Sequence, residues 1–170
     1  MVVVDNFTRY TWVILLRSKS DALELIEALC TRLQNEKSLE INRIRSDHSK
    51  EFENSFMESF CTRIGISQEF SSPITPRQND VVERKNRVIQ EMAKAMLHNK
   101  DVARNLWGEA INTACQMVNR VYFRPGTKKT PCELWKGRKP NVKYFKIFGS
   151  TYFILKDKEN VGKFDSRSDE

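Results

Sequence analysis

The stretch VVVDNFTRYTWVILL, residues 2–16, decides how the chain begins to fold. A run of three valines is followed by a turn over residues 6–9 and then by β-branched and aromatic residues from Tyr10 to Leu16. This pattern predicts two antiparallel strands joined as a hairpin. Helix-like and strand-like segments then alternate along the chain, which is typical of an α/β domain.

Helical periodicity recurs four times after the hairpin, and Ser20 is expected to cap the first of these helices. Gly65 is expected to end the second helix, whose Phe56 and Phe60 are predicted to face inward. Short strands are predicted over residues 41–45, 67–70 and 147–155. The four helices are predicted over residues 20–36, 51–64, 80–98 and 103–122.

Length and composition limit the class of protein. The 170 residues, 39% of them hydrophobic, can bury the core of one domain, or of a domain with an extension. No apolar run approaches the length of a membrane span and no signal-peptide pattern opens the chain, so we expect neither secretion nor a membrane partner. The four cysteines are far apart and there are only two histidines, which disfavours a zinc site and predicts reduced thiols in an intracellular protein.

The net charge of +7 is concentrated in one part of the sequence. Residues 120–148 hold nine lysines and arginines against Glu133 alone, with aromatic residues between them. A merely soluble surface would also be charged, but segregation of the charge favours contact with nucleic-acid phosphates. The basic residues are Arg120, Arg124, Lys128, Lys129, Lys136, Arg138, Lys139, Lys143 and Lys146.

A carboxylate set among cations marks the start of the predicted helix 80–98. Glu83 follows a polar loop stiffened by Pro73 and Pro76, and one face of the helix is polar. An ordinary i,i+4 pair of Glu83 with Arg87 would explain part of this pattern, but not the further cations. The residues predicted to contact DNA are Arg84, Lys85, Asn86, Arg87, Gln90 and Lys94.

Several motifs, in a fixed order along the chain, resemble those of a known protein family. The chain resembles, over nearly its whole length, the catalytic core of a retroviral-type integrase, and among these most closely that of copia-type retrotransposon Pol polyproteins. The resemblance implies a ribonuclease H-like α/β fold, a mixed sheet flanked by helices. It rests on VVDNFTRYTWVILL, IRSDHSKEF, SSPITPRQNDVVERKNR, LWGEAINTACQMVNR, KTPCELWKGRKP and FKIFGS.

Family members insert element DNA into a target with two divalent metal ions, magnesium or manganese, held by two Asp and one Glu. The resemblance assigns the second Asp to Asp47 and the Glu to Glu83, 36 positions apart, as catalytic and metal-binding residues. Asp5 matches an Asp on the second strand of the family, which is not a metal ligand. The strand that carries the first catalytic Asp is therefore expected to be missing, leaving about four strands in the sheet and the Val2–Val4 side exposed.

Two further departures concern loops near the expected site. The family's Asp-Asn-Gly-Gly-Glu-Phe is here Asp47 to Phe52 without glycine, and its Gln-Asn-Gly ends here in Asp80. The leading hypothesis is consequently an inactive integrase core that keeps nucleic-acid binding. The alternatives are an active integrase, if the first Asp is present upstream in the full product or if Asp5 substitutes for it, and a domesticated DNA- or protein-binding module.

The resemblance also implies partners, location and organisation. The expected partners are DNA, as element ends and target, and further copies of the chain, with no small-molecule substrate. The expected location is the nucleus or an intracellular particle. The expected domains are an integrase core over residues 1–122, incomplete at its N-terminus, and a basic extension over residues 123–170.

Overall fold

The computed structural model describes residues 1–49, 52–71, 80–99, 101–152, 154–155 and 168–169. It opens with a hairpin of β1 (Val2–Val4) and β2 (Thr11–Val13), which are antiparallel with Val3 opposite Trp12. The turn between them is closed by Asp5, whose carboxylate accepts bonds from both the backbone N–H and the hydroxyl of Thr8. The predicted hairpin is confirmed.

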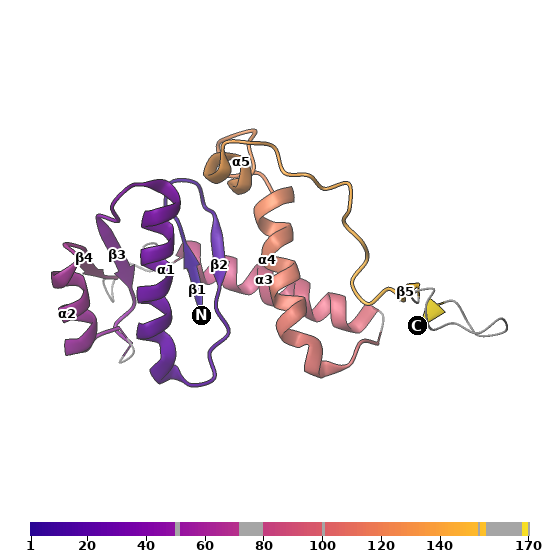
Figure 1. Ribbon diagram of the computed structural model, residues 1–170, viewed down its shortest axis with the longest axis horizontal. Coiled ribbons are helices and arrows are strands. Elements are labelled where there is room, and N and C mark those ends of the chain that lie inside the picture. Colours follow the sequence, from indigo (N-terminus) through magenta and orange to yellow (C-terminus); the bar gives the residue numbers. More distant parts are fainter. Residues whose placement is uncertain (50–51, 72–79, 100, 153, 156–167, 170) are drawn as a thin grey trace.

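A second unit packs α1 (Ala22–Lys37) and α2 (Ser55–Arg63) against the parallel pair β3 (Arg43–Ser46) and β4 (Ser67–Phe70). Figure 1 shows α1 between this pair and the hairpin. The shared core contains Ile26, Cys30, Met57, Phe60, Cys61 and Ile66.

A third unit joins two long helices, α3 (Asp80–Asn99) and α4 (Trp107–Val121). Ile89 and Ala93 of α3 pack against a row of small and β-branched residues on α4, including Ala114 and Val118. Gly108, which precedes this row, lies against the hairpin: a Cβ there would lie 2.8 Å from the end of the Leu15 side chain. The contact between α3 and α4 is made through small and β-branched side chains.

A buried amide connects α4 to the hairpin. Asn119 accepts a hydrogen bond from the backbone N–H of Thr11 at 2.9 Å and donates to the Thr11 carbonyl at 2.7 Å. The Cys115 thiol donates to the same carbonyl at 3.2 Å. These bonds occupy the edge of β2 that faces away from β1.

Beyond α4 the chain forms a short helix, α5 (Pro131–Lys136), and then an extended segment over residues 138–150, which we call the strap. In Figure 1 the strap leads from α5 back toward the C-terminal end of α3. Two short strands, β5 (Ile154–Leu155) and β6 (Ser168–Asp169), pair antiparallel near the end of the chain. Of the strand expected over residues 147–155, only β5 is found in the described residues.

The expectation of one sheet with about four strands is wrong for the described residues, which form three separate two-stranded sheets. The backbone bonds show which edge of β1 has no strand beside it among the described residues. Met1 and Ile14 exchange both of their bonds, so the alternating antiparallel pattern directs the N–H and C=O groups of Val2 and Val4 away from β2. Among the described residues no strand meets that edge, although the Val2–Val4 side chains are half-buried.

The four predicted helices are confirmed, with corrections at their ends. The first is preceded by a 3₁₀ turn (Lys19–Asp21) capped by Ser18, not Ser20, in a reciprocal box with Asp21. Gly65 follows the end of α2 with a φ of 72°, as predicted. Phe56, in contrast, is 73% exposed, because only one side of α2 meets α1 and β4.

The four cysteines are free and buried. Among the described residues, no helix combines the length and the apolar character that crossing a membrane requires.

Candidate functional site

Asp47 stands directly after β3, in an exposed position. Its Oδ1 accepts a bond from the backbone N–H of Ser49 at 3.3 Å, which leaves most of the carboxylate directed to solvent. Close by, His48 stacks on Phe70 with ring centroids 4.9 Å apart and contacts Glu53 at 3.2 Å. The segment after β3 is thus held to the end of β4 by His48, so the backbone beside Asp47 is anchored.

A buried hydroxyl without a partner lies just before Asp47. Ser46 ends β3, and its Oγ makes no hydrogen bond to the described residues. Its neighbours on the strand, Arg43 and Arg45, both form ion pairs with Glu69 of β4, at 2.7 and 2.9 Å. Those two cations are therefore partly neutralised.

Glu83 lies in the first turn of α3 and is exposed. A carboxylate in this position is favoured by the partial positive charge at a helix N-terminus. The loop that precedes it, residues 72–79, with Pro73, Pro76 and Gln78, is outside the described residues. Whether the carboxylates of Asp47 and Glu83 lie near one another stays a prediction.

The residues predicted to contact DNA differ in their availability. Arg87, Gln90 and Lys94 are exposed on α3, and Gln90 donates to the Asn86 side chain at 3.0 Å. Arg84 is also exposed but forms an i,i+4 ion pair with Asp80 at 2.6 Å.

The Glu83–Arg87 pair, considered above as the ordinary explanation of this pattern, is not among the ion pairs of the described residues. The spacing of Asp80 and Arg84 in the sequence was the signal for the pair that forms instead.

Lys85 points elsewhere. It is half-buried, and this burial lowers the pKa of its ammonium group, with a smaller effect in the same direction from Arg9. Cys115 acts in the opposite direction. These neighbours belong to the hairpin turn and to α4, so Lys85 faces the interior side of α3 and is a weaker candidate for phosphate contact than Arg87.

The Asp5 carboxylate has a structural role in the hairpin turn. Thr8 donates to its Oδ2 from the backbone at 2.7 Å and from the hydroxyl at 2.6 Å, and Arg9 donates from its backbone N–H to the Asp5 carbonyl. A carboxylate so engaged closes a turn. This supports the view that Asp5 does not take the place of the first catalytic Asp.

A site for two metal ions needs more oxygen ligands than Asp47 and Glu83 provide. Divalent magnesium prefers clustered oxygen ligands, and a pair of ions needs a carboxylate that bridges them. Among the described residues, no three or more His, Cys, Asp or Glu side chains lie together where they could hold an ion. Asp47 and Glu83 are suitable in kind for one ion, but the described residues do not fit a two-ion site.

The cations of the basic segment 120–148 fall into two groups, those that contact other parts of the chain and those exposed to solvent. Arg124 donates to the carbonyl of Phe7 at 2.7 Å and lies over the Phe7 ring, while Arg120 lies over the Phe145 ring. These two arginines hold the hairpin turn and the strap. The remaining cations are exposed on α5, its flanking loops and the strap, a separation that composition alone did not reveal.

Comparison with known proteins supports the sequence resemblance. The family model described as integrase core domain matches residues 1–76. The Pol polyprotein of the tobacco (Nicotiana tabacum) transposon TNT 1-94 is 31% identical over 165 residues, covering 97% of this chain and 12% of that polyprotein. The Arabidopsis thaliana transposon RE1 polyprotein is 30% identical over 168 residues, covering 99% of this chain and 11% of the polyprotein. The chain thus spans about a tenth of the length of these relatives.

Solved structures share the fold. The HTLV-2 integrase catalytic core domain in complex with magnesium, in a trimeric form, superposes with a TM-score of 0.59 at 21% identity, covering 78% of this chain and 80% of that one. A chain of the simian T-cell lymphotropic virus intasome in complex with PP2A regulatory subunit B56 gamma gives a TM-score of 0.65 at 16% identity. That match covers 98% of this chain and 58% of the other.

Proposed function

We propose a function from the premise that this chain is an integrase core domain, homologous over nearly its whole length to plant retrotransposon Pol polyproteins. The proposed function is to bind DNA without joining it. The activity typical of its family is DNA integration, by 3′-processing and strand transfer. The observation that carries the proposal is the use of Asp5 in the hairpin turn, which leaves Asp47 and Glu83 as the two assigned carboxylates.

The chemistry explains why two carboxylates are too few. Paired ions, when bound, stabilise both the attacking and the leaving oxygen of a phosphodiester. Asp47 and Glu83 would provide oxygen ligands for one of them. Because the described residues offer no carboxylate assigned to bridge a second ion, we expect weak binding of one ion and no cleavage or joining.

Binding of DNA rests on different residues. Arg87 and Lys94 are exposed on α3, and neither depends on a metal ligand. Phosphate contacts of this kind position a protein on DNA without reading its sequence. We therefore expect affinity that is independent of sequence and falls steeply with salt.

The first experiment tests catalysis. Strand-transfer assays with blunt and recessed DNA duplexes, in magnesium and separately in manganese, should give no joined product. Joining that is lost in Asp5→Asn would overturn the proposal, because it would make Asp5 a metal ligand. Joining that is lost in Asp47→Asn and Glu83→Gln but kept in Asp5→Asn would instead support the alternative of an active integrase.

The second experiment tests binding. The double variant Arg87→Glu/Lys94→Glu should bind duplex DNA more weakly and reduce the slope of log affinity against log salt by about two. The control Arg32→Glu/Arg104→Glu makes the same change of charge at exposed positions outside α3 and should leave the slope near that of the wild type. Absent or salt-insensitive DNA binding by the wild type would favour the alternative of a module that binds protein.

The proposal includes self-association. The HTLV-2 core is described in trimeric and dimeric forms, and the simian virus chain belongs to an intasome. Light scattering after gel filtration should show a mass above that of one 19.9 kDa chain. A strictly monomeric mass at high micromolar concentration would contradict this part.

A further inference from the structure

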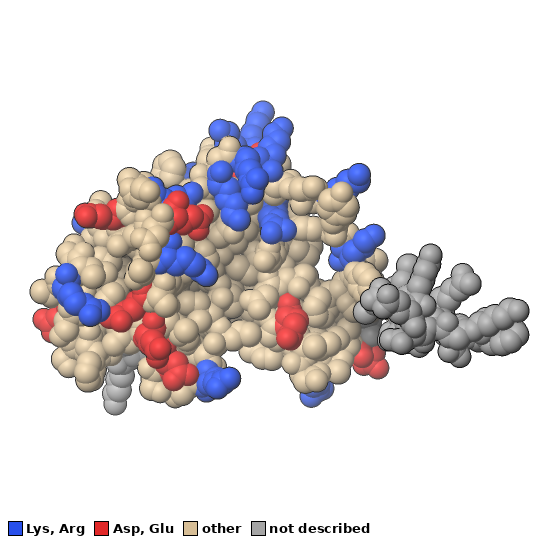
Figure 2. Space-filling view, viewed as in Figure 1, with Lys and Arg blue, Asp and Glu red and all other residues tan. Residues whose placement is uncertain are grey.

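Five cations gather around α5: Lys128, Lys129, Lys136, Arg138 and Lys139. We call this group the α5 patch. All five are exposed, and Figure 2 shows lysine and arginine side chains crowded over α5 on the face in view. The single acid within residues 128–139 is Glu133, which accepts hydrogen bonds from Thr130, and the segment has a net charge of +4.

Hydrogen bonds at the ends of α5 and in the preceding loop hold the backbone beneath the patch. Thr130 caps α5 and accepts from the Glu133 N–H at 3.2 Å, while the Glu133 carboxylate accepts from the Thr130 backbone and hydroxyl at 2.8 and 2.9 Å. Gly137 ends the helix with a φ of 69°. The preceding loop is closed by a bond from the Arg124 N–H to the Lys129 carbonyl at 2.9 Å.

Side chains then fix α5 to the rest of the molecule. Trp135 lies 5.0 Å from Trp12 and 5.8 Å from Tyr10 between ring centroids, and its indole N–H donates to Glu36 at 3.0 Å. The Lys37 ammonium donates to the Trp135 carbonyl and lies over its ring. One face of α5 is thus docked on the hairpin and α1, and the cations occupy the outer side.

None of the five cations takes part in an ion pair among the residues that the structure describes. Elsewhere Arg43, Arg45, Arg63 and Arg84 each have a carboxylate partner. A cluster of like charges repels itself, and this cost is removed when a polyanion binds. The clustering of five exposed cations at one place, rather than the lack of ion pairs alone, makes the α5 patch suited to such a ligand.

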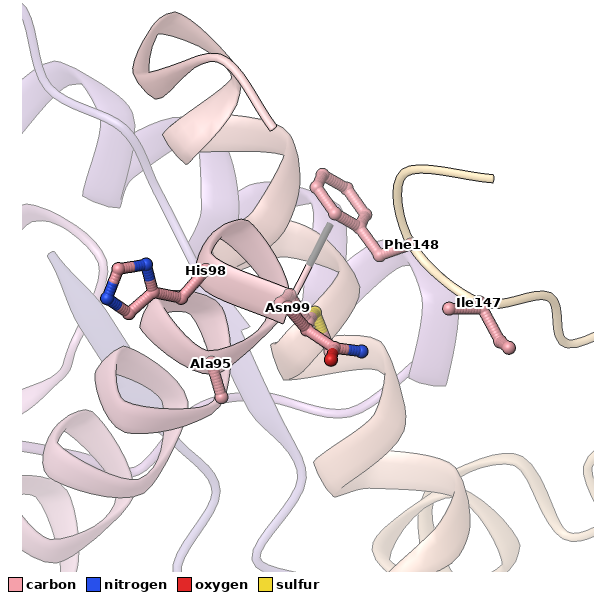
Figure 3. A pocket seen from close by; sticks show the side chains of 6 residues that line it. Ala95, His98, Asn99, Ile147 and Phe148 are labelled. Carbon is pink, nitrogen blue, oxygen red and sulfur yellow. The ribbon is translucent and has the colours of Figure 1, made fainter. Parts of the chain in front are cut away.

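The strap extends the positive surface away from α5. It carries Lys143 and Lys146, both exposed, and Figure 2 shows further basic side chains along its course. Its far end is held where Phe148 packs against the core formed by α3 and α4, and Figure 3 shows Phe148 among the residues that line one pocket with Ala95 and Asn99. The backbone that carries the cations is therefore held to the helices at α5 and at Phe148.

We propose that the α5 patch, continued by Lys143 and Lys146, is a second nucleic-acid contact, which binds the phosphate backbone away from the metal ligands and from α3. Its chemistry is that of a row of unpaired ammonium and guanidinium groups meeting a row of phosphates, with release of counterions as the driving force. It deepens the proposed function but does not depend on Asp47 and Glu83, or on Arg87 and Lys94 of α3.

The test compares two triple variants of equal charge change, Lys128→Gln/Lys136→Gln/Lys139→Gln and Arg17→Gln/Arg32→Gln/Arg104→Gln. All six side chains are exposed. Binding of a fluorescent 30-base-pair duplex of arbitrary sequence is measured by anisotropy across a salt series. The patch variant should bind about tenfold more weakly at moderate salt, with a slope smaller by two to three. The control variant should bind within about twofold of the wild type.

Equal losses in both variants would overturn the proposal, because net charge alone would then explain binding. Stronger binding of polyglutamate than of DNA, abolished by the patch variant, would overturn it in favour of an acidic protein partner. If the triple variant unfolds early in a thermal melt, the three single variants replace it, each expected to lower the slope by about one. Loss of DNA binding in Arg87→Glu/Lys94→Glu alone, with the patch variant unaffected, would refute the DNA contact at the α5 patch and leave the proposed function intact.

Discussion

At the scale of single residues, the Asn119 side chain is the clearest case of an amide that takes the place of a neighbouring strand's backbone groups. It gives Thr11 both a donor and an acceptor in a buried setting, as a neighbouring strand would. Nothing in the sequence marked it, because one Asn on the largely apolar face of a predicted helix has no periodic signal. Only the packing of α4 on the hairpin makes it necessary.

Asn119→Ala should therefore destabilise the fold by about 2–3 kcal/mol, since it leaves the buried N–H of Thr11 without a partner and its C=O with only the weaker bond from the Cys115 thiol. Urea denaturation followed by circular dichroism measures the change. Asn112→Ala, at an exposed position of the same helix, is the matched control and should change the free energy of unfolding by less than about 0.5 kcal/mol. Equal effects would mean that the contact with Thr11 contributes nothing.

The cysteines offer a second prediction at this scale. Burial raises the pKa of the Cys30 thiol to about 11, with further contributions from Cys61 and Glu27, and burial raises that of Cys115 to about 11 against the opposing effect of Lys85. The thiolate is the reactive form, so both should be nearly inert to iodoacetamide at pH 7.5 in the folded chain. Mass spectrometry should show both modified at least about a hundredfold faster in urea. Rapid labelling without urea would show that the core opens.

At the scale of elements, α5 is a six-residue helix whose existence depends on its ends. Helices this short are unstable alone, and the Thr130–Glu133 box supplies the missing bonds at its start. The Thr130 backbone and hydroxyl bonds lower the pKa of Glu133 below its ordinary value of 4.5, with smaller contributions from Lys139 and Lys129. The carboxylate form is thus the one that stabilises the helix.

The sign of the resulting pH dependence follows directly. A lowered pKa in the folded state gives stability that is fully present above the unfolded value of about 4.5 and is lost as the pH falls through the lower folded value. The wild type should melt at a higher temperature than Glu133→Gln at pH 7, and the difference should shrink below pH 4.5. Glu91→Gln, at an exposed position on α3, is the control. A difference that stays constant down to pH 2 would refute the role of the carboxylate.

At the scale of elements, the helices and some of their ends could be predicted from the sequence, but other features could not. The helices were predictable because their apolar residues repeat locally, and Gly65 marked an end through its own backbone preference. Ser18 was missed in favour of Ser20 because both serines suit a cap, and only the position of Asp21 three residues after Ser18 decides between them. Phe56 was misplaced because an amphipathic pattern does not tell how wide the covered face is.

At the scale of the whole molecule, the predicted ribonuclease H-like α/β fold of an integrase core is confirmed. The predicted single sheet is not formed by the described residues. The sequence could not reveal this, because the pairing of distant strands is not encoded in the periodicity of either strand. The candidate site was predictable only as far as residue types. Asp47 and Glu83 are exposed at the end of β3 and the start of α3, while their mutual geometry stays a prediction.

The unequal edges of the hairpin have a consequence for hydrogen exchange. The Thr11 amide, held by Asn119 on one edge, should exchange with deuterium slowly. On the other strand, Val3 lies opposite Trp12 in a bonded pair, whereas the amides of Val2 and Val4 point away from β2 and meet no strand of the described residues. Protection along β1 should therefore alternate from one residue to the next. In Asn119→Ala the Thr11 amide should lose its protection, so that both edges of this two-stranded sheet would exchange as freely as a loop.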